Sequence, residues 1–158
     1  MELTMATVAL AFKEAFYNAA KELMAEDPET ESVYVVFGQP ATIDPDEIIS
    51  FGSVGAGQEK ATLGTNRSRE ETLTLDVQIS VVRGGEEEAE ILASRRCYEL
   101  LRKLEYYVRV TDTTVSQTVR ECFLTSHDSP GATPEEVMHK GRMIDVLATF
   151  TAKARIRN

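Results

Sequence analysis

The residues best suited to covalent chemistry are one cysteine and the histidines that follow it. Cys122 and His127 would make a nucleophile and its general base if the fold turned the imidazole toward the thiol. Nothing in the sequence orients that ring, and Cys122 falls inside a predicted strand, so we expect a packed thiol. His127 and His139 are twelve residues apart, which is not a metal-binding spacing such as HxxxH.

A glycine-rich stretch, "GSVGAGQEK" at residues 52–60, resembles a phosphate-binding loop at first reading. It lacks the G-K-[ST] ending and does not lead from a strand into a helix, which that motif requires. "FGSVG" is not the GxSxG motif of serine hydrolases either, because Gly52 stands directly before Ser53. We therefore expect the tip of a β-hairpin here.

Three acidic residues flank a proline in "DPDE" and suggest a weak calcium site, formed by Asp44, Asp46 and Glu47. The spacing of an EF-hand loop and its terminal glutamate are missing, so a solvated turn is the simpler interpretation. Cys97 and Cys122 form neither a CxxC pair nor a disulfide framework, and we expect two reduced thiols in a protein made in the cytosol. No cofactor is expected.

Basic residues are conspicuous because the chain is acidic, with 26 acidic and 17 basic side chains and a net charge of −9. Such a chain is a poor candidate for wrapping nucleic acid, which calls for a basic patch. The basic residues are either ordinary surface charge or partners for acidic patches of a neighbouring molecule. They are Arg67, Arg69, Lys153, Arg155 and Arg157.

Two long stretches with a period of two must position these side chains. Between Leu73 and Val81, and again between Ile144 and Ile156, apolar residues alternate with mostly polar ones. This pattern predicts strands with one buried and one polar face. The second strand would span roughly 40 Å, about twice the usual length. The buried faces require a covering layer, and the polar faces meet either solvent or another molecule.

Helical periodicity supplies that layer. Residues 5–25 and 86–107 each carry one apolar stripe, and the run Glu86–Glu88 suits the positive end of a helix dipole. Further strands are predicted at 32–38, as a central strand, at 47–54 and at 114–126. The order α-β-β-β-α-β-β predicts a single α+β domain over 1–158, in which two helices pack on one face of a mixed or antiparallel sheet of about five strands. A long hairpin loop is expected at about 52–70.

Targeting signals are not expected. The first residues are "MELTMATVALAFKEAF", which include Glu2 and lack the basic region of a signal peptide. No apolar run approaches the roughly 20 residues that span a membrane.

Nearly the whole chain resembles the tail terminator (tail completion) proteins of long-tailed bacteriophages. The resemblance lies in the order and texture of the segments and involves no signature motif. The segments are "VALAFKEAFYNAAKEL", "GSVGAGQEKATLGTNRSREE", "TLTLDVQISVV", "RGGEEEAEILASRRCYELLRKLE" and "IDVLATFTAKARI".

That resemblance implies a structural virion protein without enzymatic activity, made in the bacterial host and placed in the tail or neck. It implies a ring of six copies with strands extended across subunit boundaries. The hairpin tip would contact the tail tube protein, the other face would meet the head–tail connector protein, and genome DNA would pass through without specific binding. By position alone, the interface residues would be Gly55, Gly57, Gln58, Lys60, Leu63, Arg67, Arg69, Lys153, Arg155 and Arg157.

Two alternatives remain open at this stage. The first is another neck or tail component, namely a head–tail adaptor or a tail tube subunit. A tube subunit would polymerise into long stacks, whereas a terminator would stop at a ring. The second is a small α+β ligand-binding module or enzyme, which would have a closed apolar pocket with convergent polar groups.

Overall fold

A computed structural model describes residues 6–61, 68–131, 133 and 141–157 of the chain. In these ranges the chain forms two α-helices, a single π-helical turn and five strands. The elements, in order, are α1 (Ala9–Ala25), β1 (Tyr34–Phe37), β2 (Glu47–Lys60), β3 (Arg69–Arg83), α2 (Glu87–Tyr106), η1 (Tyr107–Thr111), β4 (Glu121–Asp128) and β5 (Arg142–Ile156). The predicted α+β class and element order are confirmed.

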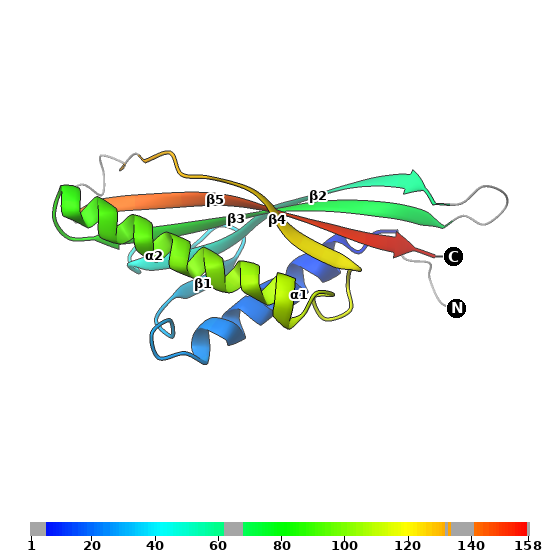
Figure 1. The fold of residues 1–158 in the computed structure, drawn as a ribbon, viewed down its shortest axis with the longest axis horizontal. Helices are drawn as coiled ribbons and strands as arrows, with labels where there is room; N and C mark the ends of the chain where they lie inside the picture. Colours follow the sequence, from blue (N-terminus) through cyan, green and yellow to red (C-terminus); the bar gives the residue numbers. More distant parts are fainter. Residues whose placement is uncertain (1–5, 62–67, 132, 134–140, 158) are drawn as a thin grey trace.

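The five strands form one mixed sheet in the order β1-β2-β3-β5-β4. Only β1 runs parallel to its neighbour β2, and the other three pairs are antiparallel. The two long strands predicted from the alternating pattern, β3 and β5, lie side by side from Arg69–Ile156 at one end to Arg83–Arg142 at the other. They form the axis of an elongated molecule (Figure 1).

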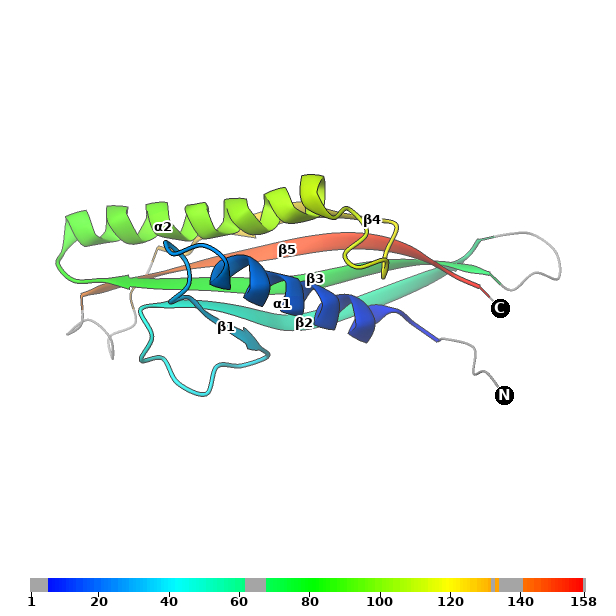
Figure 2. The same ribbon diagram turned by 90° about the horizontal axis from the view of Figure 1, so that it is seen from below.

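Both helices pack on the same face of the sheet, α1 over β1 and β2 and α2 over β3 and β5 (Figure 2). Phe16 of α1 is fully buried between Phe51 and Phe150, at ring-centroid distances of 5.2 and 5.0 Å. The alternating apolar residues of β3 and β5 point into this layer, and the opposite face of the sheet carries no helix. The position of the core therefore agrees with the expectation from the pattern.

The strand predicted at 32–38 was wrongly placed at the centre of the sheet. β1 is a four-residue edge strand. Its central residues, Val35 and Val36, are nonetheless both buried. A short strand at the edge of a sheet can be covered on both faces. The apolar residues on both faces of β1 therefore did not distinguish an edge strand from a central one.

The strand predicted at 114–126 begins only at Glu121. Val115, Ser116 and Gln117 adopt positive φ angles of 44°, 55° and 61°, which form a left-handed turn. The Asp112 carboxylate stabilises this turn by accepting the backbone N–H of Ser116 at 2.8 Å. The sequence "TVSQTV" alternates like a strand, but this local hydrogen bonding overrides the pattern.

The long loop expected at about 52–70 is strand over residues 52–60 and 69–70, and residues 62–67 of it lie outside the described residues. β2 continues to Lys60 and β3 begins at Arg69, with glycines paired to threonines in Gly55–Thr74 and Gly57–Thr72. The prediction failed because this part of the hairpin has little apolar alternation on β2, although backbone pairing forms without it.

Candidate assembly interface

The most unusual feature of the molecule is the outer half of the β2–β3 hairpin, Ser53–Lys60 with Arg69–Leu75, which we call the arm. The outer end of the arm projects past the two helices, together with the end of β5 (Figure 1). Its inner part is covered, because Glu71, Leu73 and Leu75 are fully buried. On β2 every residue from Gly55 to Lys60 is exposed. The exposed residues at this strand end are well placed to contact another molecule.

A buried carboxylate connects the arm, near its outer end, to the start of α1. Glu71 of β3 is fully buried and accepts the Val8 backbone N–H at 2.8 Å and the Gln58 side-chain amide at 2.7 Å. Gln58 also donates to the Ala6 carbonyl at 2.7 Å. Burial by itself would raise the pKa of Glu71, but hydrogen bonds from Thr7, Val8 and Gln58 hold it below the usual value.

The outer edge of β2 is unpaired along the arm. β1 pairs with β2 only from Ile48 to Phe51, and no other described strand pairs with this edge beyond it. Ala61 donates to the Ser68 carbonyl at 3.0 Å, so the odd-numbered arm residues of β2 point their backbone groups toward β3. Because these directions alternate along an antiparallel strand, the outward-pointing N–H and C=O groups are those of Val54, Ala56, Gln58 and Lys60.

The other side of the sheet ends in a second unpaired edge. β4 pairs with β5, and its outer edge has no partner among the described strands. β4 is eight residues long, from Glu121 to Asp128. Exposed edges of this kind are templates for pairing with another chain.

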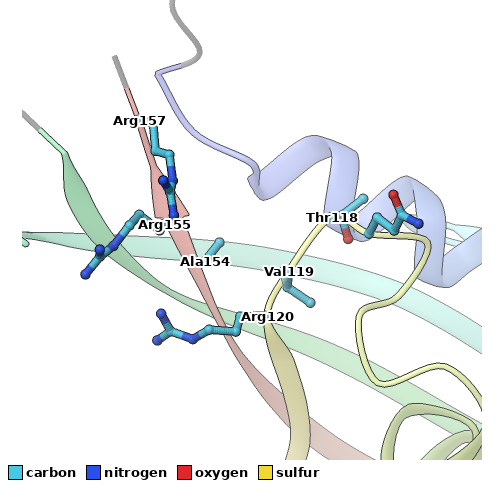
Figure 3. Close-up of a pocket in the computed structure, with 7 residues that line it drawn as sticks. Thr118, Val119, Arg120, Ala154, Arg155 and Arg157 are labelled. Atoms are coloured by element: carbon cyan, nitrogen blue, oxygen red, sulfur yellow. The ribbon is translucent and has the colours of Figure 1, made fainter.

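Basic side chains gather where β4 begins and β5 ends. Arg120 and Arg155 both approach the Glu70 carboxylate, with Arg155 Nε 3.7 Å away. These arginines and Arg157 border a shallow depression of about 340 Å³ (Figure 3). One carboxylate shared by two guanidinium groups leaves net positive charge at this position.

The helix-free face of the sheet is polar across three strands. Thr149 donates to Asp76 at 3.1 Å, and the Thr125 and Thr151 hydroxyls lie 2.8 Å apart. Two large apolar side chains are exposed among them, Phe123 at 49% and Leu147 at 44%. The surface of this face therefore consists largely of hydrogen-bonded polar side chains, and no described helix covers it.

The structure brings most of the predicted interface residues together. Gly55, Gly57, Gln58, Lys60 and Arg69 lie on the arm. The residues Lys153, Arg155 and Arg157 lie at or beside the end of β5 next to the arm. Leu63 and Arg67 lie outside the described residues.

Sequence reasoning missed Arg120, Glu70 and Glu71. The signal for Glu71 was present, because it extends the buried series of Leu73 and Leu75 by one step of two residues. A carboxylate on a buried face calls for hydrogen-bond donors, and these could have been sought on the first helix.

The candidate nucleophile and base are not arranged for catalysis. Cys122 is 1% exposed, and burial raises the pKa of its thiol to about 12. His127 Nδ1 instead lies 3.3 Å from the Tyr98 hydroxyl at the surface. His139 lies outside the described residues.

The acidic turn differs from the expected solvated turn at Glu47, which is 7% exposed. Arg96 binds this carboxylate at 2.8 and 3.0 Å, and Arg83 forms a further ion pair with it. Burial opposes the charge, but these arginines hold the pKa of Glu47 below its usual value. Within the described ranges no group of three or more His, Cys, Asp or Glu residues could hold a metal ion.

Comparison with known proteins does not identify a family for the chain. No protein-family model and no curated protein sequence matches the chain. Among solved structures, a chain from the virion of a native gene transfer agent particle is similar at 12% identity, covering 98% of this chain and 100% of the other, with a TM-score of 0.49. None of the described helices is long and apolar enough to cross a membrane.

Proposed function

We propose that this chain is a structural virion protein, a phage tail terminator whose copies close into a ring that caps the tail tube and joins it to the head–tail connector. The observation that carries the proposal is the pair of unpaired edges at opposite sides of the sheet. The free edge of β2 along the arm, Ser53–Lys60, has eight residues, the same length as β4. A chain with two complementary edges can join copies head to tail.

Strand directions allow the two edges to pair. Counting across the sheet from β2, each neighbour is antiparallel to the one before it, so β4 of one copy would run antiparallel to β2 of the next. The outward backbone groups on β2 belong to helix-side residues such as Ala56. The same alternation gives Cys122 and Leu124 on β4, so the joined sheet keeps its helices on one side.

A ring built in this way would have its helices outside and its polar face inside, because the bulkier layer needs the larger circumference. The inner wall would then carry the acidic residues Glu59, Glu70, Asp76 and Glu121. Against them stand three basic residues, Arg120, Lys153 and Arg155, so the excess of acidic residues is small and is locally reversed around Glu70. An excess of carboxylates repels phosphate, so genome DNA would pass without binding.

The mechanism in this proposal is steric and requires no cofactor or catalytic step. Edges that pair within the ring are no longer available for growth, and one ring covers the open end of the tube. The arm, as the exposed projection of each copy, would contact the tube protein.

A proline at Ala56 tests the edge pairing, because Ala56 points its N–H away from β3 and proline removes only that donor. We expect Ala56→Pro to abolish the ring and leave a folded monomer. Ala56→Val is the matched control, since it keeps the N–H and should assemble normally. Rings of full size from Ala56→Pro would refute the edge pairing, and open-ended stacks from the native protein would indicate a tube subunit.

A further inference from the structure

The polar face of β4 carries one large apolar side chain at the free edge of the sheet. Phe123 is 49% exposed, and its register partner on β5 is Thr151. Its neighbours along the strand, Cys122 and Leu124, face the helix layer and pack into the core. No described strand lies beyond β4. Because aromatic residues are enriched at protein–protein interfaces, Phe123 is a candidate contact of the edge pairing.

The free edge of β2 offers a complementary feature on the same face of the sheet. Gly55 and Gly57 are the register partners of Thr74 and Thr72 on the polar face of β3. A Cβ at Gly57 would meet nothing within 4 Å, so the space above its backbone is open. An aromatic side chain on a neighbouring strand can cover an exposed glycine of this kind.

The edge pairing proposed above, on which this inference rests, allows three registers for Phe123. The outward backbone groups of β4 flank Phe123 and must meet outward backbone groups of β2. Phe123 therefore lies opposite one of the β2 residues between those groups. These residues are Gly55, Gly57 and Glu59.

The ends of the two strands exclude the outer registers. With Gly55 opposite Phe123, the end of β4 would reach Phe51, whose edge is already paired with β1. With Glu59 opposite Phe123, the start of β4 would pass Lys60, the last residue of β2, and the ring would lie on a carboxylate. Only the middle register, with Gly57, keeps all of β4 on the free part of β2.

We propose that Phe123 of one copy packs over Gly57 of the next copy and that this contact sets the register of the edge pairing. β4 then lies along β2 from Glu59 to Ser53, because its bulge at Thr125 contains one extra residue. Phe123 and Gly57 form a non-hydrogen-bonded pair with Cα atoms about 4.5 Å apart, the kind of pair in which side chains come closer. The missing side chain of Gly57 leaves room for the phenyl ring.

Charges balance around the outer end of this joint. Three acidic and three basic residues of the polar face meet there, namely Glu59, Glu70, Glu121, Arg120, Lys153 and Arg155. Within one copy Glu59 lies directly opposite Glu70 and forms no ion pair with any described residue. Glu121 of the neighbouring copy would face Glu59, and Arg120 beside it offsets their repulsion.

Cysteine crosslinking of the purified chain tests the register without changing Phe123. In the predicted register Glu59 and Glu121 are opposite each other, at a separation that a disulfide can bridge. The matched control is Gly57→Cys/Glu121→Cys, which reports the register that places Phe123 on Gly55. The native chain gives the background, because its two cysteines are buried. After oxidation, a denaturing gel without reductant should show a ladder of linked copies for Glu59→Cys/Glu121→Cys and mostly single chains for the other two proteins.

Phe123→Ala tests whether the phenyl ring contributes to assembly. We expect the concentration at which half of the chains are assembled to rise at least about tenfold, measured by light scattering over a concentration series. Leu147→Ala is the control, because Leu147 is similarly exposed on the same face but lies on β5, away from both edges. A shift no larger than that of the control would overturn the proposal.

These outcomes are distinguishable from a failure of the edge pairing itself. Rings of the native protein with a ladder only in the control pair, or in neither pair, would overturn the contact between Phe123 and Gly57 while the edge pairing stands. A ladder from Glu59→Cys/Glu121→Cys that persists when Ala56→Pro is added would overturn the edge pairing and this register with it. A native chain that is monomeric at every concentration would also overturn both.

Discussion

The Val8 backbone N–H donates a 2.8 Å hydrogen bond to the carboxylate of Glu71, sixty-three residues further along the chain. This contact joins the start of α1 to the arm near its outer end. Gln58 strengthens it from β2, since its amide binds both Glu71 and the Ala6 carbonyl. The Glu71 carboxylate and its donors therefore hold the arm against the start of α1.

Replacing Glu71 by glutamine should destabilise both the fold and the arm. The amide keeps the shape but loses the charge that receives the donors, and an imperfectly satisfied buried group costs about 1–3 kcal/mol. Urea unfolding should show this loss, and hydrogen exchange should be faster in Gln58 and its strand. Glu70→Gln, at a partly exposed ion pair on the other face, should cost less than about 1 kcal/mol. Equal losses of unfolding free energy in the two variants would contradict a stabilising role for the hydrogen bonds of Glu71.

Glu47→Gln should be the more damaging of the buried carboxylate changes. It leaves Arg83 and Arg96 beside a neutral group in a site that joins β2, the end of β3 and α2. We expect a loss of about 3 kcal/mol, the lower end of the range for breaking a buried ion pair, because Arg83 keeps access to water. Circular dichroism during urea unfolding measures it, and a loss below about 1 kcal/mol would contradict the assignment.

Acid should destabilise the protein through the same carboxylates. The pKa values of Glu47 and Glu71 are lowered in the folded state from an ordinary value of 4.5. As pH falls below that value, the unfolded chain takes up protons that the folded chain does not, so stability decreases until the folded pKa is passed. Unfolding midpoints between pH 7 and pH 3 should fall most steeply below about pH 4.5. Glu47→Gln should reduce the pH dependence of the unfolding midpoint below pH 4.5. An unchanged pH dependence would show that Glu47 does not contribute to the acid destabilisation.

Gly141 should not tolerate a side chain. Its φ is +125°, and a Cβ there would lie 2.1 Å from the Arg83 carbonyl oxygen. Gly141→Ala combines a strained backbone with a main-chain clash, so we expect a loss of at least about 3 kcal/mol. Gly57→Ala is the control, because a Cβ at Gly57 meets nothing within 4 Å. Comparable melting temperatures for the two variants would contradict this geometry.

The sequence predicts the body of the fold well because strict alternation in β3 and β5 and the helical stripes each fit one structure. The prediction fails where backbone pairing or local polar contacts determine the conformation of the chain. The arm strand of β2 has little apolar alternation to reveal it, and the turn at Val115–Gln117 is held by Asp112, which no strand pattern includes. The interface residues on the arm and β5 were placed by position alone. Their convergence depends on the register between Arg69 and Ile156, which periodicity does not specify.

The most direct test of the ring is the mass of the native protein in solution, measured by light scattering over a concentration series, with electron microscopy of the main peak. Two free edges on one chain predict closed rings of uniform size that do not lengthen as concentration rises. A strict monomer at every concentration, or open-ended tubes that grow with concentration, would contradict the account.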